Sequence, residues 1–105
     1  MNRSRREMLQ EMLTDEPNDP ELRYMLAMEY VSEGDDEAAV RGFEEIMRLF
    51  PQYPPAYHQA GQTLARLGRI EQARAVLHSG IPVAQQGGNY HAAGEMTELL
   101  DSLEG

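Results

Sequence analysis

Apolar side chains return every three or four positions along most of this chain, which is the spacing expected of amphipathic helices. In the stretch that ends at Gly34, the recurring apolar residues are Leu22, Met25, Leu26, Tyr30 and Val31. In the stretch that ends at Pro51, they are Val40, Phe43, Ile46, Met47 and Phe50. The same spacing continues after Pro54 and again after residue 70. The pattern therefore predicts an all-α protein of about six helices.

Residues that favour helix ends place the boundaries between these helices. Ser4 and Glu7 have the spacing of a capping box, in which each side chain accepts a hydrogen bond from a free N–H of the first turn. This predicts a first helix over residues 4–14. Asp19 is a suitable N-cap, and Pro20 suits the first helical position because its missing N–H leaves no hydrogen bond unmade there. A second helix is therefore expected to begin at Pro20.

The helix expected from about residue 70 contains a proline. The ring of Pro82 clashes with the carbonyl of His78 in a regular helix, and its nitrogen cannot donate a hydrogen bond. We expect a kink rather than an end at this point, because Val83 and Ala84 continue the apolar side. Gly87-Gly88 is the expected break.

Asn89 is expected to cap a last helix over residues 89–103. Its expected apolar face consists of Ala92, Met96, Leu99 and Leu103, with Glu95, Glu98 and Asp101 towards the other side. The end of a helical array requires a helix that is apolar inward and polar outward, so we interpret this helix as a cap.

The sequence aligns with itself when it is shifted by 34 residues. The shift pairs Pro20 with Pro54, Gly34 with Gly68, Ala39 with Ala73 and Phe43 with Leu77, and it extends over residues 9–84. Small residues recur where the two helices of a pair must approach closely. We therefore predict a single domain over residues 1–105, made of a half-repeat helix at 4–14, repeats at 20–53 and 54–87, and a capping helix at 89–103.

The stretch Leu26-Ala27-x-x-Tyr30-x-x-x-Gly34, followed by Ala39, Phe43 and Pro51, resembles the signature of the tetratricopeptide repeat family. The stretch Tyr57-x-x-x-Gly61 with Gly68, Ala73 and Leu77 is similar but matches less fully. Ile46 and Gly80 depart from the family, which prefers alanine at both positions, so helix spacing should differ between the two repeats. The resemblance implies an alpha-alpha superhelix, that is, a TPR-like solenoid of antiparallel helix pairs.

In that family, the first helices of the repeats line a concave groove that holds a peptide or a helix of a partner protein. The resemblance assigns this groove to Tyr24, Met28, Val31, Ser32, His58, Gln62, Ala65 and Arg66, with Tyr53 near its rim. The implied function is a protein–protein interaction scaffold or adaptor, with an apolar, aromatic half and a polar, basic half to its groove. Two alternatives stay open, namely Tyr24 and Met28 as core beneath the first helix and Arg66 as a solvated charge.

Self-association as a homodimer is the alternative function. Two repeats with caps are fewer than the three repeats that usually make a stable array. Seven methionines and five tyrosines would supply adaptable apolar surface for contact between exposed repeat faces.

The charge balance disfavours several classes of partner. Eighteen acidic residues against nine arginines, with no lysine, give a net charge of −9, which repels the phosphate backbone of nucleic acids. Arg3, Arg5 and Arg6 form a small basic cluster, which we expect to be a solvated tail and not a site for an anionic membrane. The first residues lack the apolar segment of a secretory signal, and no apolar stretch is long enough to span a membrane, so we expect a cytoplasmic protein.

The sequence shows no arrangement of residues typical of an enzyme or a cofactor site. It contains no cysteine, and its histidines at 58, 78 and 91 fall on three different predicted helices, so no metal site is expected. Gly87-Gly88 is followed by no lysine that would make it a phosphate loop. We therefore expect no catalytic residue, no metal and no cofactor.

Overall fold

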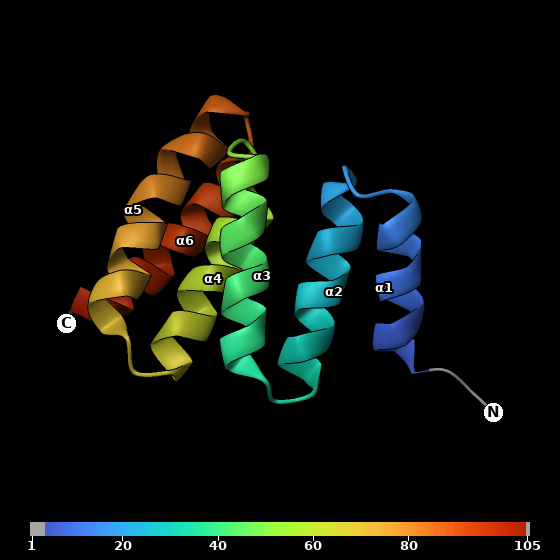
Figure 1. Cartoon of the computed structure of the whole chain (residues 1–105). Helices are drawn as coiled ribbons and strands as arrows, with labels where there is room; N and C mark the ends of the chain where they lie inside the picture. Colours follow the sequence, from blue (N-terminus) through green and yellow to red (C-terminus); the bar gives the residue numbers. More distant parts are fainter. Residues whose placement is uncertain (1–3, 105) are drawn as a thin grey trace.

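The computed structural model describes residues 4–104 and folds them into six helices and no strand. In chain order these are α1 (Arg5–Asp15), α2 (Pro20–Ser32), α3 (Asp36–Leu49), α4 (Pro54–Arg66), α5 (Ile70–Gln86) and α6 (Tyr90–Glu104). Each helix packs against the next one in the chain, and α4 also contacts α6. Figure 1 shows α3 and α5 in front of α4 and α6, with α1 and α2 at one end of the array. This is the expected all-α solenoid of helix pairs, and it is 48 Å long.

Side chains fix the beginnings of the first two helices. Ser4 Oγ accepts a hydrogen bond from Glu7 N at 3.1 Å, and the Glu7 carboxylate accepts one from Ser4 N at 3.4 Å, which confirms the predicted capping box. Asp19 Oδ1 accepts a hydrogen bond from Glu21 N at 2.9 Å, and α2 begins at Pro20 as predicted. Each of these bonds satisfies an N–H that the helix itself leaves free.

The proline in α5 does not end the helix. α5 continues through Pro82 to Gln86, as predicted, and the chain then turns at Gly87-Gly88. Gly88 adopts a φ of 76°, a left-handed conformation that glycine takes at little cost. The kink expected at Pro82 stays a prediction.

The core combines small residues where helices approach with large residues between them. The small ones, each at most 1% exposed, are Ala27, Ala39, Ala60 and Ala73, and the large ones are Phe43, Ile46, Leu64 and Leu77. A Cβ added to Gly80 would lie only 2.4 Å from Cβ of Tyr57, so α5 approaches α4 there more closely than an alanine allows. Ile46 occupies the equivalent place in the first repeat. At this position the first repeat therefore has a large side chain, whereas the second repeat has a glycine that lets the two helices pack closely.

α6 packs its expected apolar face against the core and buries two further residues. Its buried residues are Ala93, Met96 and Leu100, whereas Ala92, Leu99 and Leu103 are only partly buried. All four predicted residues pack against the core, and the prediction missed Ala93 and Leu100, which are buried more deeply. Apolar side chains stand at both 92 and 93 and at both 99 and 100, and Ala93 and Leu100 join the buried cluster that contains Tyr57 and Leu77. Asn89 caps the helix as predicted, with Oδ1 accepting from Ala92 N at 3.1 Å.

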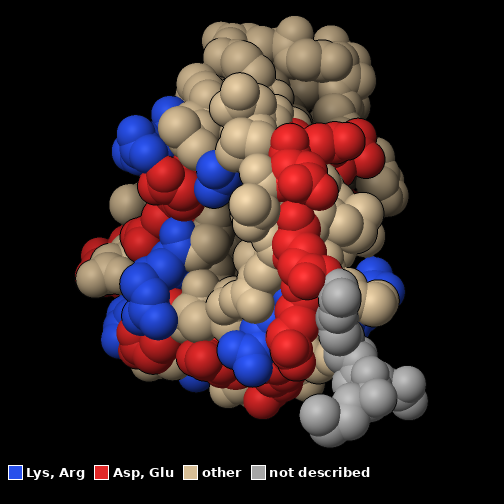
Figure 2. All heavy atoms as spheres, turned by 45° about the vertical axis from the view of Figure 1, so that its right-hand side comes forward, with Lys and Arg blue, Asp and Glu red and all other residues tan. Residues whose placement is uncertain are grey.

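Acidic side chains outnumber arginines two to one, and arginines lie beside several of them. Figure 2 shows a column of Asp and Glu side chains down one face of the molecule, with arginines and further acids to its side. Ion pairs join Arg48 to Glu45, Arg66 to Asp36, Arg69 to Glu37 and Arg74 to Glu71. Within residues 4–104, no helix is both long enough and apolar enough to cross a membrane.

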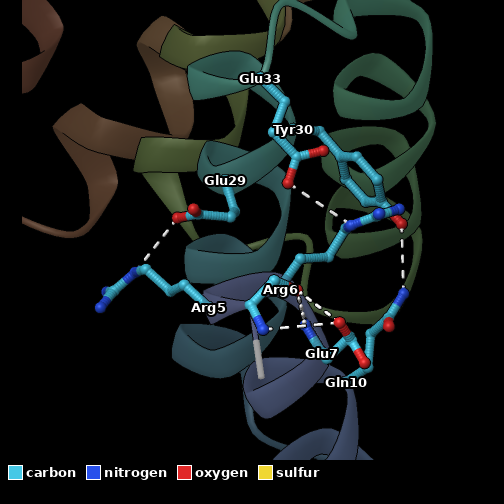
Figure 3. Close-up of polar contacts among 8 residues, drawn as sticks. Arg5, Arg6, Glu7, Gln10, Glu29, Tyr30 and Glu33 are labelled. Atoms are coloured by element: carbon cyan, nitrogen blue, oxygen red, sulfur yellow. Dashed lines mark hydrogen bonds and ion pairs between the residues drawn. The ribbon is translucent and has the colours of Figure 1, made fainter. Parts of the chain in front are cut away.

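Arg5 and Arg6 lie in the first turn of α1, where they tie it to α2 (Figure 3). Arg5 Nε is 3.1 Å from the Glu29 carboxylate, and Arg6 Nε is 3.4 Å from that of Glu33. The prediction of a solvated tail was therefore wrong for both residues. Their partners come from an antiparallel neighbour, which spacing within one helix does not reveal. Arg3 lies outside the described residues.

Candidate functional site

Two adjoining recesses open between α2, α4 and α6. The first has a volume of about 340 Å³ and is lined by Tyr24, Pro55, His58, Gln59, Asn89, His91, Ala92 and Glu95. The second, also of about 340 Å³, is lined by His58, Gln62, Glu95, Glu98 and Leu99. His58 and Glu95 border both recesses. The two recesses are therefore continuous, and we call the depression that they form the central groove.

α4 supplies the floor of the central groove. Ala60 and Gly61 are buried, and Gly61 lies so close to Leu77 of α5 that an added Cβ would be 2.7 Å from the Leu77 side chain. This packing turns the half-buried His58 and Gln62 towards α6. His58 Nε2 and Gln62 Nε2 are 3.3 Å apart, within hydrogen-bond distance. α4 thereby presents a ring nitrogen and an amide, one helical turn apart, to the second recess.

Tyr24 forms the α2 wall of the groove and also supports the core. Its ring centroid lies 5.9 Å from that of Phe43 and 5.9 Å from that of Tyr53. Burial raises the pKa of the Tyr24 hydroxyl, and a hydrogen bond with Gln59 partly opposes that increase. The two interpretations of Tyr24, as core and as groove, are therefore compatible.

The other expected groove residues do not line either recess. Met28 and Val31 are partly buried and pack against the cluster that contains Phe43. Arg66 turns towards α3, with Nη2 3.2 Å from Asp36 Oδ1 and Nε 3.3 Å from Asp36 Oδ2. The residues Ser32, Tyr53 and Ala65 also lie outside both recesses. Because the Arg66 charge is paired with Asp36, neither recess has the basic half that was expected.

Three polar groove residues come from α6 and were not predicted, namely His91, Glu95 and Glu98. His91 Nε2 lies 3.5 Å from Glu95 Oε1. The 34-residue register ends before α6, so sequence reasoning places both glutamates on the outer side of a cap. The 34-residue shift does not find them either, since it pairs His58 with Ala92 and Gln62 with Met96. Within residues 4–104, no three His, Cys, Asp or Glu side chains are grouped so that they could hold a metal ion.

Comparison with known protein families identifies the kind of helical array. A family model described as "Tetratricopeptide repeat" matches residues 30–95. The chain belongs to the tetratricopeptide repeat family. A comparison with curated protein sequences finds no match.

Three solved structures resemble most of the chain. A tetratricopeptide repeat domain protein from Salinibacter ruber, solved by crystallography, is 30% identical with a TM-score of 0.78, covering 82% of this chain and 96% of that one. Protein BPP2914 from Bordetella parapertussis is 26% identical with a TM-score of 0.83, covering 98% and 90%. PcrH in complex with the chaperone binding region of PopD shares the fold, with a TM-score of 0.87 at 16% identity, covering 94% and 75%.

The family gives the coarse function. Tetratricopeptide repeats are protein-interaction scaffolds, and their fold is typically non-enzymatic. The chain is thus a protein-interaction module of this kind, in agreement with the function implied by its sequence.

Proposed function

We propose that this tetratricopeptide repeat protein is a non-enzymatic adaptor that binds a peptide or a helix of a partner protein in the central groove. The observation that carries the proposal is that α2, α4 and α6 all contribute side chains to one continuous depression. PcrH supports it, because a protein with the same fold was solved in complex with the chaperone binding region of PopD.

The composition of the groove suits a protein segment. Tyr24, Pro55 and Leu99 offer apolar surface for side chains, and His58 and Gln62 offer polar groups for a backbone or a side chain. Pockets that recognise ligands combine such apolar surface with a few placed polar groups.

Filling the groove is expected to abolish binding of such segments. Random peptides of about 12 residues, displayed on phage, would be selected on the parent protein and measured again on His58→Trp/Gln62→Trp. Because two indole rings occupy the floor, groove-binding peptides should bind about tenfold more weakly or worse to this variant. Fluorescence polarisation with the synthetic peptides provides the measurement.

The control variant is Arg41→Trp/Glu44→Trp, which adds the same bulk to an exposed part of α3 that borders neither recess. Both variants leave the net charge unchanged, and circular dichroism checks that both remain helical. If every selected peptide binds His58→Trp/Gln62→Trp as tightly as the parent, the groove is not the binding site.

Self-association is a second candidate, favoured by exposed methionines at the α1 end of the array. Met8 and Met12 stand one turn apart on α1 and are 46% and 50% exposed, and Met25 of α2 is 37% exposed. Adaptable methionine surface of this kind is common at interfaces. Sedimentation at two concentrations should then show a dimer that Met8→Gln/Met12→Gln dissociates. A monomer at both concentrations would remove this candidate.

A further inference from the structure

We propose that the central groove selects partner segments that carry an arginine or a lysine beside an apolar side chain. This inference rests on the proposed function and adds the chemistry of the occupant. The two recesses are lined by two glutamates, Glu95 and Glu98, and by no aspartate, lysine or arginine.

The two carboxylates are placed to share one cation. Glu95 and Glu98 stand three residues apart on α6, which puts their side chains on the same face of the helix. Both border the second recess, where the floor is formed by His58 and Gln62. A guanidinium or ammonium group entering this recess would meet two carboxylates and no arginine or lysine. Charged hydrogen bonds of this kind are stronger than those between neutral groups.

No arginine of the protein itself occupies this role. Arg66, the arginine of α4, is paired with Asp36 of α3. Arg74 of α5 pairs with Glu71 and donates a hydrogen bond to the Leu103 carbonyl at 2.7 Å. Within residues 4–104, Glu95 and Glu98 form no ion pair with an arginine, and an external cation would therefore displace no arginine from them.

The remaining groove surface defines the neighbour of this cation. Tyr24 and Pro55 border the first recess, Leu99 borders the second, and Glu95 borders both. An extended segment lying along the groove would therefore place an apolar side chain against Tyr24 and Pro55, and a cationic one between the α6 glutamates. The net charge of −9 also attracts cationic segments at longer range and raises their rate of association.

The test uses the phage-displayed random peptides themselves as probes. Peptides that bind the parent but are lost on His58→Trp/Gln62→Trp define the groove-dependent set. That set should be enriched in arginine and lysine relative to the unselected library. Each such peptide should bind about fivefold more weakly to Glu95→Gln/Glu98→Gln, the loss expected from removing two partly exposed ion pairs.

The matched control is Asp15→Asn/Glu44→Gln, which removes two exposed carboxylates elsewhere and changes the net charge by the same amount. It should weaken binding less than about twofold, because only long-range attraction is lost. Raising the salt from about 0.05 M to about 0.5 M should weaken binding to the parent more than binding to Glu95→Gln/Glu98→Gln.

The outcomes separate the two proposals. The proposal of a cationic occupant is overturned if the groove-dependent peptides are not enriched in arginine and lysine. It is also overturned if they bind Glu95→Gln/Glu98→Gln as tightly as the parent. Either result leaves the adaptor function standing. Acidic enrichment would overturn it in the same way. If no groove-dependent peptide is found at all, the adaptor function and this inference fail together.

Discussion

Replacing Phe43 by alanine is expected to lower the free energy of unfolding by about 3–5 kcal/mol, the range for removing a buried aromatic ring. Phe43 is 0% exposed, and its neighbours Ala27, Ala39 and Ala60 are small residues that are themselves buried. Because these alanines have no rotamers with which to close the gap, a cavity would remain. A domain of this size is stabilised by about 5–15 kcal/mol in total, so the variant should be close to unfolding at room temperature.

Urea unfolding followed by circular dichroism measures this loss. The urea concentration at the midpoint should fall, while the dependence of the unfolding free energy on urea concentration should stay similar. Phe43→Leu is the matched control, since leucine stands at the equivalent position 77 of the second repeat. It should retain most of the stability, with a loss of about 1.5 kcal/mol or less. Equal midpoints for Phe43→Ala and the parent would show that Phe43 does not occupy the centre of the first repeat.

The helices were predictable from sequence because local chemistry specifies them. Ser4 with Glu7 and Asp19 with Pro20 each fix a helix start through contacts within four residues, and both starts are observed. The 34-residue register likewise identifies Phe43 and Leu77 as core, and both are fully buried. In these cases the interacting residues are either close in sequence or separated by the 34-residue repeat. A pattern along the chain is therefore sufficient to predict them.

The parts that failed depend on partners far apart in sequence. Arg5 is held by Glu29 of the neighbouring helix, and no periodicity relates the two residues. Arg66 is held by Asp36, 30 residues earlier, and this contact removes it from the groove. Once an arginine has a specific carboxylate opposite it, its position on the helix no longer decides which way its side chain turns.

The groove was only half predictable for a related reason. The resemblance to the tetratricopeptide repeat family assigns Tyr24, His58 and Gln62 to the groove, and the structure brings all three to the central groove. Glu95 and Glu98 do not follow from that resemblance, because α6 begins after a longer α5 and leaves the register. Ala92 and Leu99 of its predicted apolar face are only partly buried and border the recesses beside Glu95 and Glu98.

Replacing Gly80 by alanine is expected to destabilise the protein by about 3 kcal/mol, at the upper end of the range for overpacking. The added Cβ would lie 2.4 Å from Tyr57 Cβ and 2.9 Å from Met96 Sδ. Tyr57 Cβ is fixed to the backbone of α4, so no rotamer change removes the clash and the helices must separate. In an ordinary helix the same substitution would stabilise by about 0.5–1 kcal/mol.

Gly94→Ala provides the control, because a Cβ there meets nothing within 4 Å on the exposed side of α6. It should stabilise by about 0.5–1 kcal/mol, opposite in sign to Gly80→Ala, in the same urea titration. Shifts of the same sign for the two variants would show that α5 does not approach α4 as closely as described.

Gly80 also links stability to the proposed function, because Tyr57 and Met96 belong to the two helices that form the floor and wall of the central groove. An added methyl group that pushes on both α4 and α6 should change the position of Glu95 and Glu98 relative to His58. Gly80→Ala should therefore weaken groove-dependent peptides under conditions where it is still folded, whereas Gly94→Ala should not. Unchanged peptide affinity in folded Gly80→Ala would mean that the width of the groove is set elsewhere than at this contact.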